Sequence, residues 1–248
     1  MLNILKLDGS FNTRDIGGYY NESWSQLKKG LLYRSDKLNN LSDSDVAIIK
    51  DLGVERIIDL RCDNERKKTP NRIIDGVEYI NHPIFSNKDF SKDIDNILDG
   101  NLMIDDLFKD LYRDFVLHYT DRFAEILKKI MMDKKITIFH CTSGKDRTGF
   151  LTMLILLILE VKTEVIVFDY LESNKVDNIE LIMNNMSSVL DVPYEKMEIL
   201  KPLFYVDTKY ISKSLNTIND VYGSLPNYLN SFGINTSMHN EFKTYMLS

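Results

Sequence analysis

The stretch KITIFHCTSGKDRTG, Lys135–Gly149, decides the fold of this 248-residue chain. It opens with an apolar run bounded by polar residues, which is typical of a strand buried on both faces of a parallel sheet. A second run of this kind spans Arg56–Arg61, and two further β-rich runs span Leu31–Ser35 and Val77–Ile84. A loop and an apolar helical pattern follow the strand in Lys135–Gly149. The stretch therefore predicts a strand–loop–helix turn at the carboxyl edge of a sheet, where ligands bind in open α/β folds.

Helical patterns alternate with these strands. Ser42 is a candidate N-cap for a helix that ends near Gly53, and Ile104–Met132 keeps apolar residues at helical spacing over one long helix or two. After Cys141 the chain shows one helical pattern after another. We therefore predict an α/β fold with a mostly parallel central sheet flanked by helices, and a helix-rich C-terminal part over residues 175–248.

No repeat or linker divides the sequence, so we predict that residues 1–248 form a single domain. The polar segment Phe85–Gly100 lies between a strand and a helix. Such a connection is either a plain surface excursion or a mobile cover over an active site. On the second interpretation, residues 85–120 form a helical lid insertion.

Composition excludes several classes of protein. Hydrophobic residues make up 44% and charged residues 27%, which argues against disorder. The net charge of −6 makes the chain a poor general binder of nucleic acid or of anionic membranes. The most apolar stretch, Phe150–Leu159, is too short for stable membrane insertion. The N-terminal sequence has no secretory signal, which favours a cytoplasmic location, with secretion by a signal-independent route as the alternative.

The loop after the strand carries the chemistry. Five residues separate Cys141 from Arg147, and a short loop that closes onto a helix N-terminus can turn its backbone N–H groups inward as an anion-binding nest. The guanidinium of Arg147 offers a planar fork of donors that fits two phosphate oxygens. The predicted phosphate-binding residues are Thr142, Ser143, Gly144, Lys145, Asp146, Arg147 and Thr148.

Within this loop, Cys141 is the candidate nucleophile, because converging N–H groups and a guanidinium stabilise a thiolate. Gly144 permits unusual dihedral angles, and the Thr148 hydroxyl is placed to hydrogen-bond the sulfur. His140 is expected to fix the loop through hydrogen bonds. Asp36, at the end of the Leu31–Ser35 strand, either lines the site or has a structural role.

The loop HCTSGKDRTG resembles the signature of the cysteine-dependent protein tyrosine phosphatase superfamily. Its Gly-Lys-Asp-Arg version resembles that of a bacterial tyrosine/lipid phosphatase family, tyrosine phosphatase family 3. Further motifs agree with that family: FNTRDIGGYY (Phe11–Tyr20), LLYRSDKLNNLS (Leu31–Ser42), IIDLRCDNE (Ile57–Glu65) and DYLESN (Asp169–Asn174). The resemblance implies that Cys141 forms a phospho-cysteine, that Arg147 clamps the phosphate, and that neither a metal nor another cofactor is needed.

The resemblance also implies that Asp146 is the general acid and that Lys145 binds extra phosphates of a substrate. Many tyrosine phosphatases use instead an Asp on a separate loop, which makes Asp105 and Asp106 the second candidates for the acid. The predicted partner is a phosphorylated protein, with phosphotyrosine as the first substrate. Phosphoserine, phosphothreonine and phosphoinositides are further candidates. The alternatives are an inositol polyphosphate phosphatase and a non-catalytic pseudophosphatase that binds phosphoproteins.

The chain has two cysteines, and Cys62 follows a strand just as Cys141 does. If the two strands are parallel neighbours, both thiols lie at the same sheet edge. We therefore hypothesise that a reversible Cys62–Cys141 disulfide protects the nucleophile from over-oxidation. A packed, unreactive Cys62 is the alternative.

Overall fold

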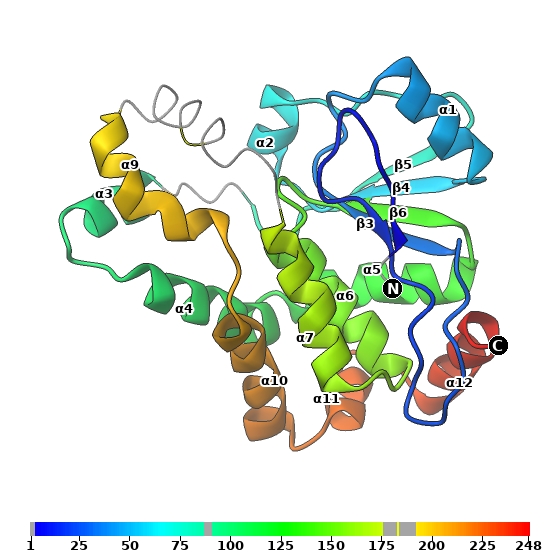
Figure 1. The fold of residues 1–248 in the computed structure, drawn as a ribbon. Helices are drawn as coiled ribbons and strands as arrows, with labels where there is room; N and C mark the ends of the chain where they lie inside the picture. Colours follow the sequence, from blue (N-terminus) through cyan, green and yellow to red (C-terminus); the bar gives the residue numbers. More distant parts are fainter. Residues whose placement is uncertain (1–2, 87–90, 176–182, 184–191) are drawn as a thin grey trace.

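A computed structural model describes residues 3–86, 91–175, 183 and 192–248 (Figure 1). Residues 87–90 of the predicted lid insertion, and residues 176–182 and 184–191 of the predicted C-terminal part, lie outside the described residues. The strands are β1 (Asn3–Ile4), β2 (Arg14–Asp15), β3 (Leu32–Ser35), β4 (Arg56–Asp59), β5 (Glu78–Asn81) and β6 (Thr137–His140). The helices of the first half are α1 (Asp43–Asp51), α2 (Asp63–Lys68), α3 (Ser91–Leu98), α4 (Ile104–Leu117) and α5 (Thr120–Asp133). Those of the second half are α6 (Asp146–Ile158), α7 (Thr163–Leu171), η1 (Glu172–Asn174), α9 (Tyr194–Leu200), η2 (Lys201–Phe204), α10 (Thr208–Tyr222), α11 (Leu225–Ser231) and α12 (Thr236–Met246).

Among the described residues the strands form one six-stranded sheet in the order β1-β2-β3-β6-β4-β5. The four strands from β3 to β5 are parallel, and β1 and β2 add an antiparallel edge. The predicted mostly parallel sheet is therefore confirmed, with β6 at its centre. The sequence did not predict β1 and β2, because strands of two residues are too short to show a periodicity.

Alternation along the strands divides the core into two layers. Ile57 and Ile138 pack with the residues of α1 on one face of the sheet. Ile58 and Phe139, one position further along, pack on the other face with the residues of α5 and α6. Figure 1 shows α1 on one side of the sheet and α5 and α6 on the other. This burial on both faces explains why the strands read as continuous apolar runs.

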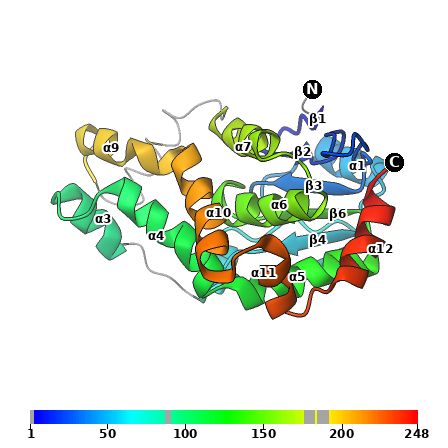
Figure 2. The same cartoon turned by 90° about the horizontal axis from the view of Figure 1, so that it is seen from below.

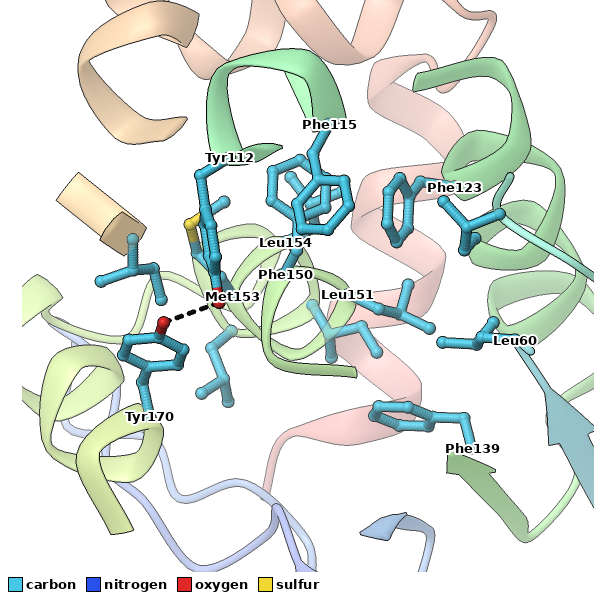
Figure 3. Close-up of a cluster of buried hydrophobic side chains, with 14 of the residues drawn as sticks. Leu60, Tyr112, Phe115, Phe123, Phe139, Phe150, Leu151, Met153, Leu154 and Tyr170 are labelled. Carbon is cyan, nitrogen blue, oxygen red and sulfur yellow. Dashed lines mark hydrogen bonds between the residues drawn. The ribbon is translucent and has the colours of Figure 1, made fainter. Parts of the chain in front are cut away.

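The helices follow the expected signals. Ser42 caps α1 and forms a capping box with Asp45, as predicted. The pattern over Ile104–Met132 is two helices, α4 and α5. Phe150–Leu159 lies almost entirely within α6, which is buried on nearly every side. Figure 3 shows aromatic rings of α4, α5 and α6 packed together, with Phe123 and Phe150 at 4.6 Å between ring centres. Within the described ranges, no helix combines the length and the apolar character that a bilayer crossing demands.

A second group of helices lies beside the sheet. Helices α3 and α9 contact each other, and α4 packs along α10. Figures 1 and 2 show α3 and α9 side by side at the end of the molecule farthest from α12. We call α3, α9 and η2 the cover, because α3 and η2 line the pocket described below.

Candidate active site

The loop of residues 141–145 connects β6 to α6 at the carboxyl edge of the sheet, with β3 on one side and β4 on the other. It therefore lies where the sequence placed it, at the ends of three parallel strands. Cys141 is buried, with 1% of its surface exposed. The helix N-terminus of α6 adds partial positive charge next to the loop.

Gly144 is required by the path of this loop. Its φ is +69°, in the left-handed region. A Cβ added at this position would lie 2.6 Å from the carbonyl oxygen of Ser35 and 2.8 Å from the backbone nitrogen of Asp36. Any larger residue would both strain the backbone and push the loop away from the end of β3.

Three successive carbonyl groups hold the loop to the surrounding protein. The backbone N–H of Lys37 donates to Thr142 O at 3.1 Å. The side-chain amide of Asn12 donates to Ser143 O at 2.9 Å, and Nη2 of Arg34 donates to Gly144 O at 2.7 Å. These bonds turn the carbonyl groups of the loop toward the surrounding protein. Such an orientation is required if the backbone N–H groups are to face inward as an anion-binding nest.

Arg147 is held by Glu65 of α2. Both terminal nitrogens of the guanidinium donate to the two carboxylate oxygens at 2.7 Å. The same carboxylate accepts from the Thr142 hydroxyl and from the Cys62 backbone N–H. Burial on its own raises the pKa of Glu65, but the hydrogen bonds and charge of Arg147 lower it to about 2. Glu65 is thus ionised at neutral pH and fixes the orientation of the guanidinium.

Asp146 is held by a pair of buried tyrosines. The Tyr112 hydroxyl donates to Asp146 Oδ1 at 3.0 Å and lies 2.6 Å from the Tyr170 hydroxyl (Figure 3). Burial, followed by the charge of Asp146, raises the pKa of Tyr112 and of Tyr170 well above the usual value, so both stay protonated. Because Tyr112 gives its one proton to Asp146, Tyr170 donates to Tyr112. Within the described residues, no hydrogen bond is made to the second carboxyl oxygen of Asp146, a residue that lines the pocket described below.

His140 joins the loop to Asn71, which follows α2 in the chain. Its Nδ1 lies 3.0 Å from Cys141 O, and its Nε2 lies 3.1 Å from the side-chain nitrogen of Asn71. Burial lowers the pKa of His140, which makes the neutral ring the stable form. We assign the proton to Nδ1, since Asn71 can only donate to Nε2. The loop-fixing role of His140 stays a prediction.

Two further predicted residues lie behind the loop. Asp36 is buried and accepts hydrogen bonds from the Ser10 hydroxyl and from the backbone N–H groups of Phe11 and Asn12. It therefore shapes the segment that carries Asn12, and burial raises the pKa of Asp36. Thr148 Oγ1 is buried and, within the described part of the chain, has no hydrogen-bond partner. That hydroxyl is available for the expected contact with sulfur.

Lys145 faces the cover. Its Nζ donates to Leu203 O of η2 at 2.8 Å and lies 5.8 Å from the centre of the Phe108 ring. Burial lowers the pKa of Lys145. The ammonium thus lies beneath the cover with a neutral oxygen as its hydrogen-bond partner.

The second candidates for the acid lie elsewhere. Asp105 accepts from Lys209 Nζ and, at 2.8 Å, from the Tyr210 hydroxyl of α10. Those hydrogen bonds lower the pKa of Asp105, and its carboxylate lines a different, more open pocket. Asp106 is paired with Lys109 at 3.5 Å on the surface of α4. Asp146 alone of the three lines the pocket beside Arg147.

That pocket encloses about 200 Å³ between the start of α6, α4 and the cover. Its charged lining residues are Asp146 and Arg147 at the start of α6 and Asp93 on α3. The remaining walls are apolar: Phe85, Ile94, Ile97, Leu107, Phe108, Leu111, Phe115 and Leu203. The segment Phe85–Gly100 therefore includes a helix that lines the pocket, and it is not a plain surface excursion.

Both cysteines are free and buried. Cys62 is the N-cap of α2, and β4 runs parallel to β6 with Asp59 opposite His140. The two thiols thus follow neighbouring parallel strands, as the redox hypothesis requires. Burial raises the pKa of Cys62, which disfavours its thiolate. The disulfide itself stays a prediction.

Sequence reasoning missed several residues of the site. Asn12, Arg34 and Glu65 lie in motifs that supported the family resemblance, but the sequence assigned no role to any of them. Their fixed place in those motifs was the available signal. Nothing in the sequence indicated that Tyr112 belongs to the site, because a tyrosine at an apolar position of a helical pattern is predicted to be a core residue.

Comparisons with known proteins cover nearly the whole chain. Residues 5–248 match the model of the tyrosine phosphatase family. A tyrosine-protein phosphatase homologue of Cupriavidus necator is 27% identical over 91% of this chain and 82% of its own length. The triple specificity protein phosphatase PtpB of Mycobacterium tuberculosis is 26% identical over 98% of this chain and 99% of its own. The solved structure of P. aeruginosa TpbA aligns at 14% identity with a TM-score of 0.35, over 69% of this chain and 86% of TpbA.

Proposed function

The chain belongs to the tyrosine phosphatase family, and on that premise we propose that it hydrolyses phosphotyrosine in proteins through a phospho-cysteine intermediate. The family match over residues 5–248 supports a single phosphatase domain over residues 1–248. One observation carries the proposal. Cys141 begins a loop that leads to an Arg147 held by Glu65, and Arg147 and Asp146 line one pocket.

In the first step, the Cys141 thiolate attacks phosphorus in line with the ester oxygen. The S–P bond forms, the P–O bond to tyrosine breaks, and the leaving phenolate takes the proton of Asp146. The loop amides and Arg147 hold the three equatorial oxygens, whose charge spreads in the transition state. Because a phenol has a pKa near 10, proton donation is worth about 10²–10⁴ in rate.

In the second step, water attacks the phospho-cysteine. The Asp146 carboxylate takes one proton of that water, the P–S bond breaks, and inorganic phosphate and the Cys141 thiolate are released. The Tyr112 hydrogen bond at 3.0 Å suits both steps, because it occupies one carboxylate oxygen and leaves the other to move the proton. Thr148 follows Arg147 directly in the chain, and its hydroxyl has no hydrogen-bond partner among the described residues. We expect this hydroxyl to stabilise the sulfur as it leaves.

The walls of the pocket support an aromatic leaving group. Next to Arg147, the side chains of Phe85, Phe108 and Leu111 offer apolar surface to a ring. An inositol polyphosphate would bring further anionic groups against these apolar walls, and burying an unpaired charge is costly. This pocket therefore favours a phosphotyrosine substrate over the soluble inositol phosphates.

Turnover of a phosphotyrosine peptide by the purified protein tests the proposal. We expect hydrolysis that vanadate blocks and EDTA does not, and that is lost in Cys141→Ser. Cys62→Ser is the matched control and should retain turnover. Binding of the peptide without hydrolysis by the unchanged protein would instead identify a pseudophosphatase.

The role of Asp146 has its own test. Asp146→Asn should lower kcat about 10²–10³-fold for phosphotyrosine, whose leaving group is poor, and far less for an aryl phosphate with an activated leaving group. Asp106→Asn, on the surface of α4, is the control and should change neither. Equal losses on both substrates would remove Asp146 from the acid role.

Phosphoinositides are the second candidate substrates. The buried Lys145 ammonium, with a carbonyl oxygen as its hydrogen-bond partner, favours them because an extra phosphate could replace that oxygen. The relative named for triple specificity is also consistent with substrates beyond phosphotyrosine. Lys145→Met should then reduce kcat/KM for a phosphatidylinositol phosphate more than for a phosphotyrosine peptide. Equal reductions would reject an extra-phosphate role.

A further inference from the structure

Two buried arginines share one carboxylate behind the phosphate-binding loop. Arg14, Arg34 and Asp169 are exposed by only 3%, 0% and 1%. They come from β2, β3 and α7, which are distant in sequence and meet beneath the loop. We call them the arginine pair and its carboxylate.

The contacts of this group reach the loop directly. Arg34 donates through Nη1 to Asp169 Oδ2 and through Nη2 to Gly144 O at 2.7 Å. Arg14 donates through Nε to Asp169 Oδ1 at 2.9 Å and also bonds the side-chain oxygen of Asn12. Since Asn12 in turn donates to Ser143 O, both arginines act on consecutive loop carbonyls.

The group carries a net positive charge. Burial alone raises the pKa of Asp169, but the charges and hydrogen bonds of Arg14 and Arg34 lower it to about 2, so it is ionised. Two guanidinium groups and one carboxylate leave one positive charge in the interior. A buried charge without a full counterion is expensive to keep. Arg56, a fully buried arginine outside this group, pairs with Asp133, a partly exposed carboxylate that also pairs with Lys129.

The other charges near Cys141 are balanced to different degrees. Among the described residues, Arg34, Lys145 and Arg147 each carry a charge that interacts with that of Cys141. Arg147 is neutralised by Glu65, whereas Lys145 has a carbonyl oxygen, Leu203 O, as its hydrogen-bond partner. The excess positive charge in this set therefore comes from the arginine pair and from Lys145.

Two titratable groups complete the surroundings. His140 is neutral because burial lowers its pKa. Asp36 lies on the β3 side of the loop, and burial raises its pKa, which reduces its ionised fraction. Neither group supplies positive charge to the sulfur.

We propose that Arg34, with Arg14 and Asp169, has two functions: it aims the loop amides by holding Gly144 O, and it supplies the net positive charge that stabilises the Cys141 thiolate. Arg34 is thus a positioning residue that acts through the loop and through its charge. It touches neither the substrate nor the reacting atoms. Its effect on the free enzyme is independent of which phosphate ester is hydrolysed.

The test measures thiolate formation without any substrate. The rate at which iodoacetamide alkylates Cys141 is followed against pH by mass spectrometry of the peptide that carries Cys141. In Arg34→Met the midpoint of this profile should rise by about one unit or more, because a cation that interacts with the charge of Cys141 is lost. In Asp169→Asn it should fall, because the pair then carries two positive charges. A purely structural role predicts shifts of the same sign in both variants.

Two matched variants sharpen this test. Arg56→Met removes an equally buried arginine at the other end of the strands and should leave the midpoint within about 0.2 units, since that charge was paired. Arg34→Lys keeps the charge but loses the two-point grip, so the midpoint should hold while kcat falls on the order of 10- to 100-fold.

Three results would overturn the proposal. One is a rise in Arg34→Met that Arg56→Met reproduces. Another is a shift of equal sign in Arg34→Met and Asp169→Asn. The third is a midpoint in Arg34→Lys that moves as far as in Arg34→Met. If circular dichroism shows that Asp169→Asn does not fold, Arg14→Met replaces it. A midpoint that rises in Arg14→Met but not in the charge-keeping Arg14→Lys then supports the charge role, and equal midpoints in these two variants overturn it.

Discussion

The loop runs into the start of α6, which lines one pocket together with the cover, but the loop and the cover are held in different ways. The loop is tied by directional polar contacts to Asn12, Arg34 and Glu65, which come from three separate parts of the sequence. The cover contributes apolar side chains such as Ile97 and Leu203, and one hydrogen bond from Lys145 joins it to the loop.

This difference follows from what each region must do. A phosphate must be held in a near-attack position, and a misplacement of about 1 Å can cost 100-fold in rate. Directional bonds between buried charges supply that precision. Apolar contacts are non-directional, so a wall built from them adapts to the leaving group. We therefore expect changes in the loop anchors to reduce kcat steeply and changes in the cover to alter KM mildly.

The largest effect is expected for Gly144→Ala. The added Cβ meets Ser35 O at 2.6 Å, so kcat/KM should fall by about 1000-fold or more as the amides lose their aim. Gly100→Ala is the matched control. It has a similar φ of +75° but nothing within 4 Å of its Cβ. It should lose only about 1 kcal/mol of stability and keep its activity. Steady-state kinetics and thermal unfolding measure both, and equal losses would refute the close-approach argument.

Glu65→Gln should come next. Glutamine can accept one hydrogen bond from Arg147 but removes the charge and the two-point grip, so kcat should fall by about 100-fold. Glu78→Gln is a control, because Glu78 pairs with Lys135 on the surface. The measurement is kcat and KM for a phosphotyrosine peptide. A higher KM with an unchanged kcat would show that Glu65 does not hold the transition-state geometry.

The anchors should also dominate acid stability. The pKa values of Glu65 and Asp169 are both lowered to about 2, from ordinary values of 4.5 and 3.8. Their stabilising contribution is complete above those ordinary values and is lost as pH falls toward 2. Urea unfolding should therefore show a smaller loss of stability between pH 6 and pH 3 in Glu65→Gln than in the unchanged protein. Parallel pH profiles would contradict the assigned shift.

A change in the cover should have a milder effect. Ile97 is 5% exposed and lines the pocket. Ile97→Ala removes apolar contact with an aryl group, so KM should rise by about three- to tenfold while kcat stays within about twofold. The measurement is the KM-to-kcat split for a phosphotyrosine peptide. A kcat loss as large as that of Glu65→Gln would erase the contrast between loop and cover.

The smallest effect is expected for Asp105→Asn. Asp105 bonds Lys209 and Tyr210, and an ion pair at the surface contributes little to stability because water screens it. Activity should stay within about twofold across leaving groups, and thermal unfolding should shift slightly. A strong dependence on the leaving group would return Asp105 to the acid role.

Local patterns in the sequence were enough for much of the fold. Apolar runs predicted β4 and β6, because strands buried on both faces need continuous apolar residues. β-rich runs predicted β3 and β5, and Ser42 predicted the start of α1. The same patterns missed β1 and β2, whose pairing depends on residues far along the chain. They also placed Asp105 beside Asp146 as a rival acid, since spacing along a chain does not reveal which pocket a carboxylate lines.

The sequence by itself determined the chemistry of the loop, because Cys141 and Arg147 lie within seven residues and local geometry joins them. Only the tertiary structure decided what holds that loop and what it faces. Glu65 reaches Arg147 across 82 positions, and Arg34 reaches Gly144 across 110. Such partners are determined by how whole helices and strands pack together. Hydrogen bonds between residues far apart in the sequence produce no periodic pattern that a single sequence could show.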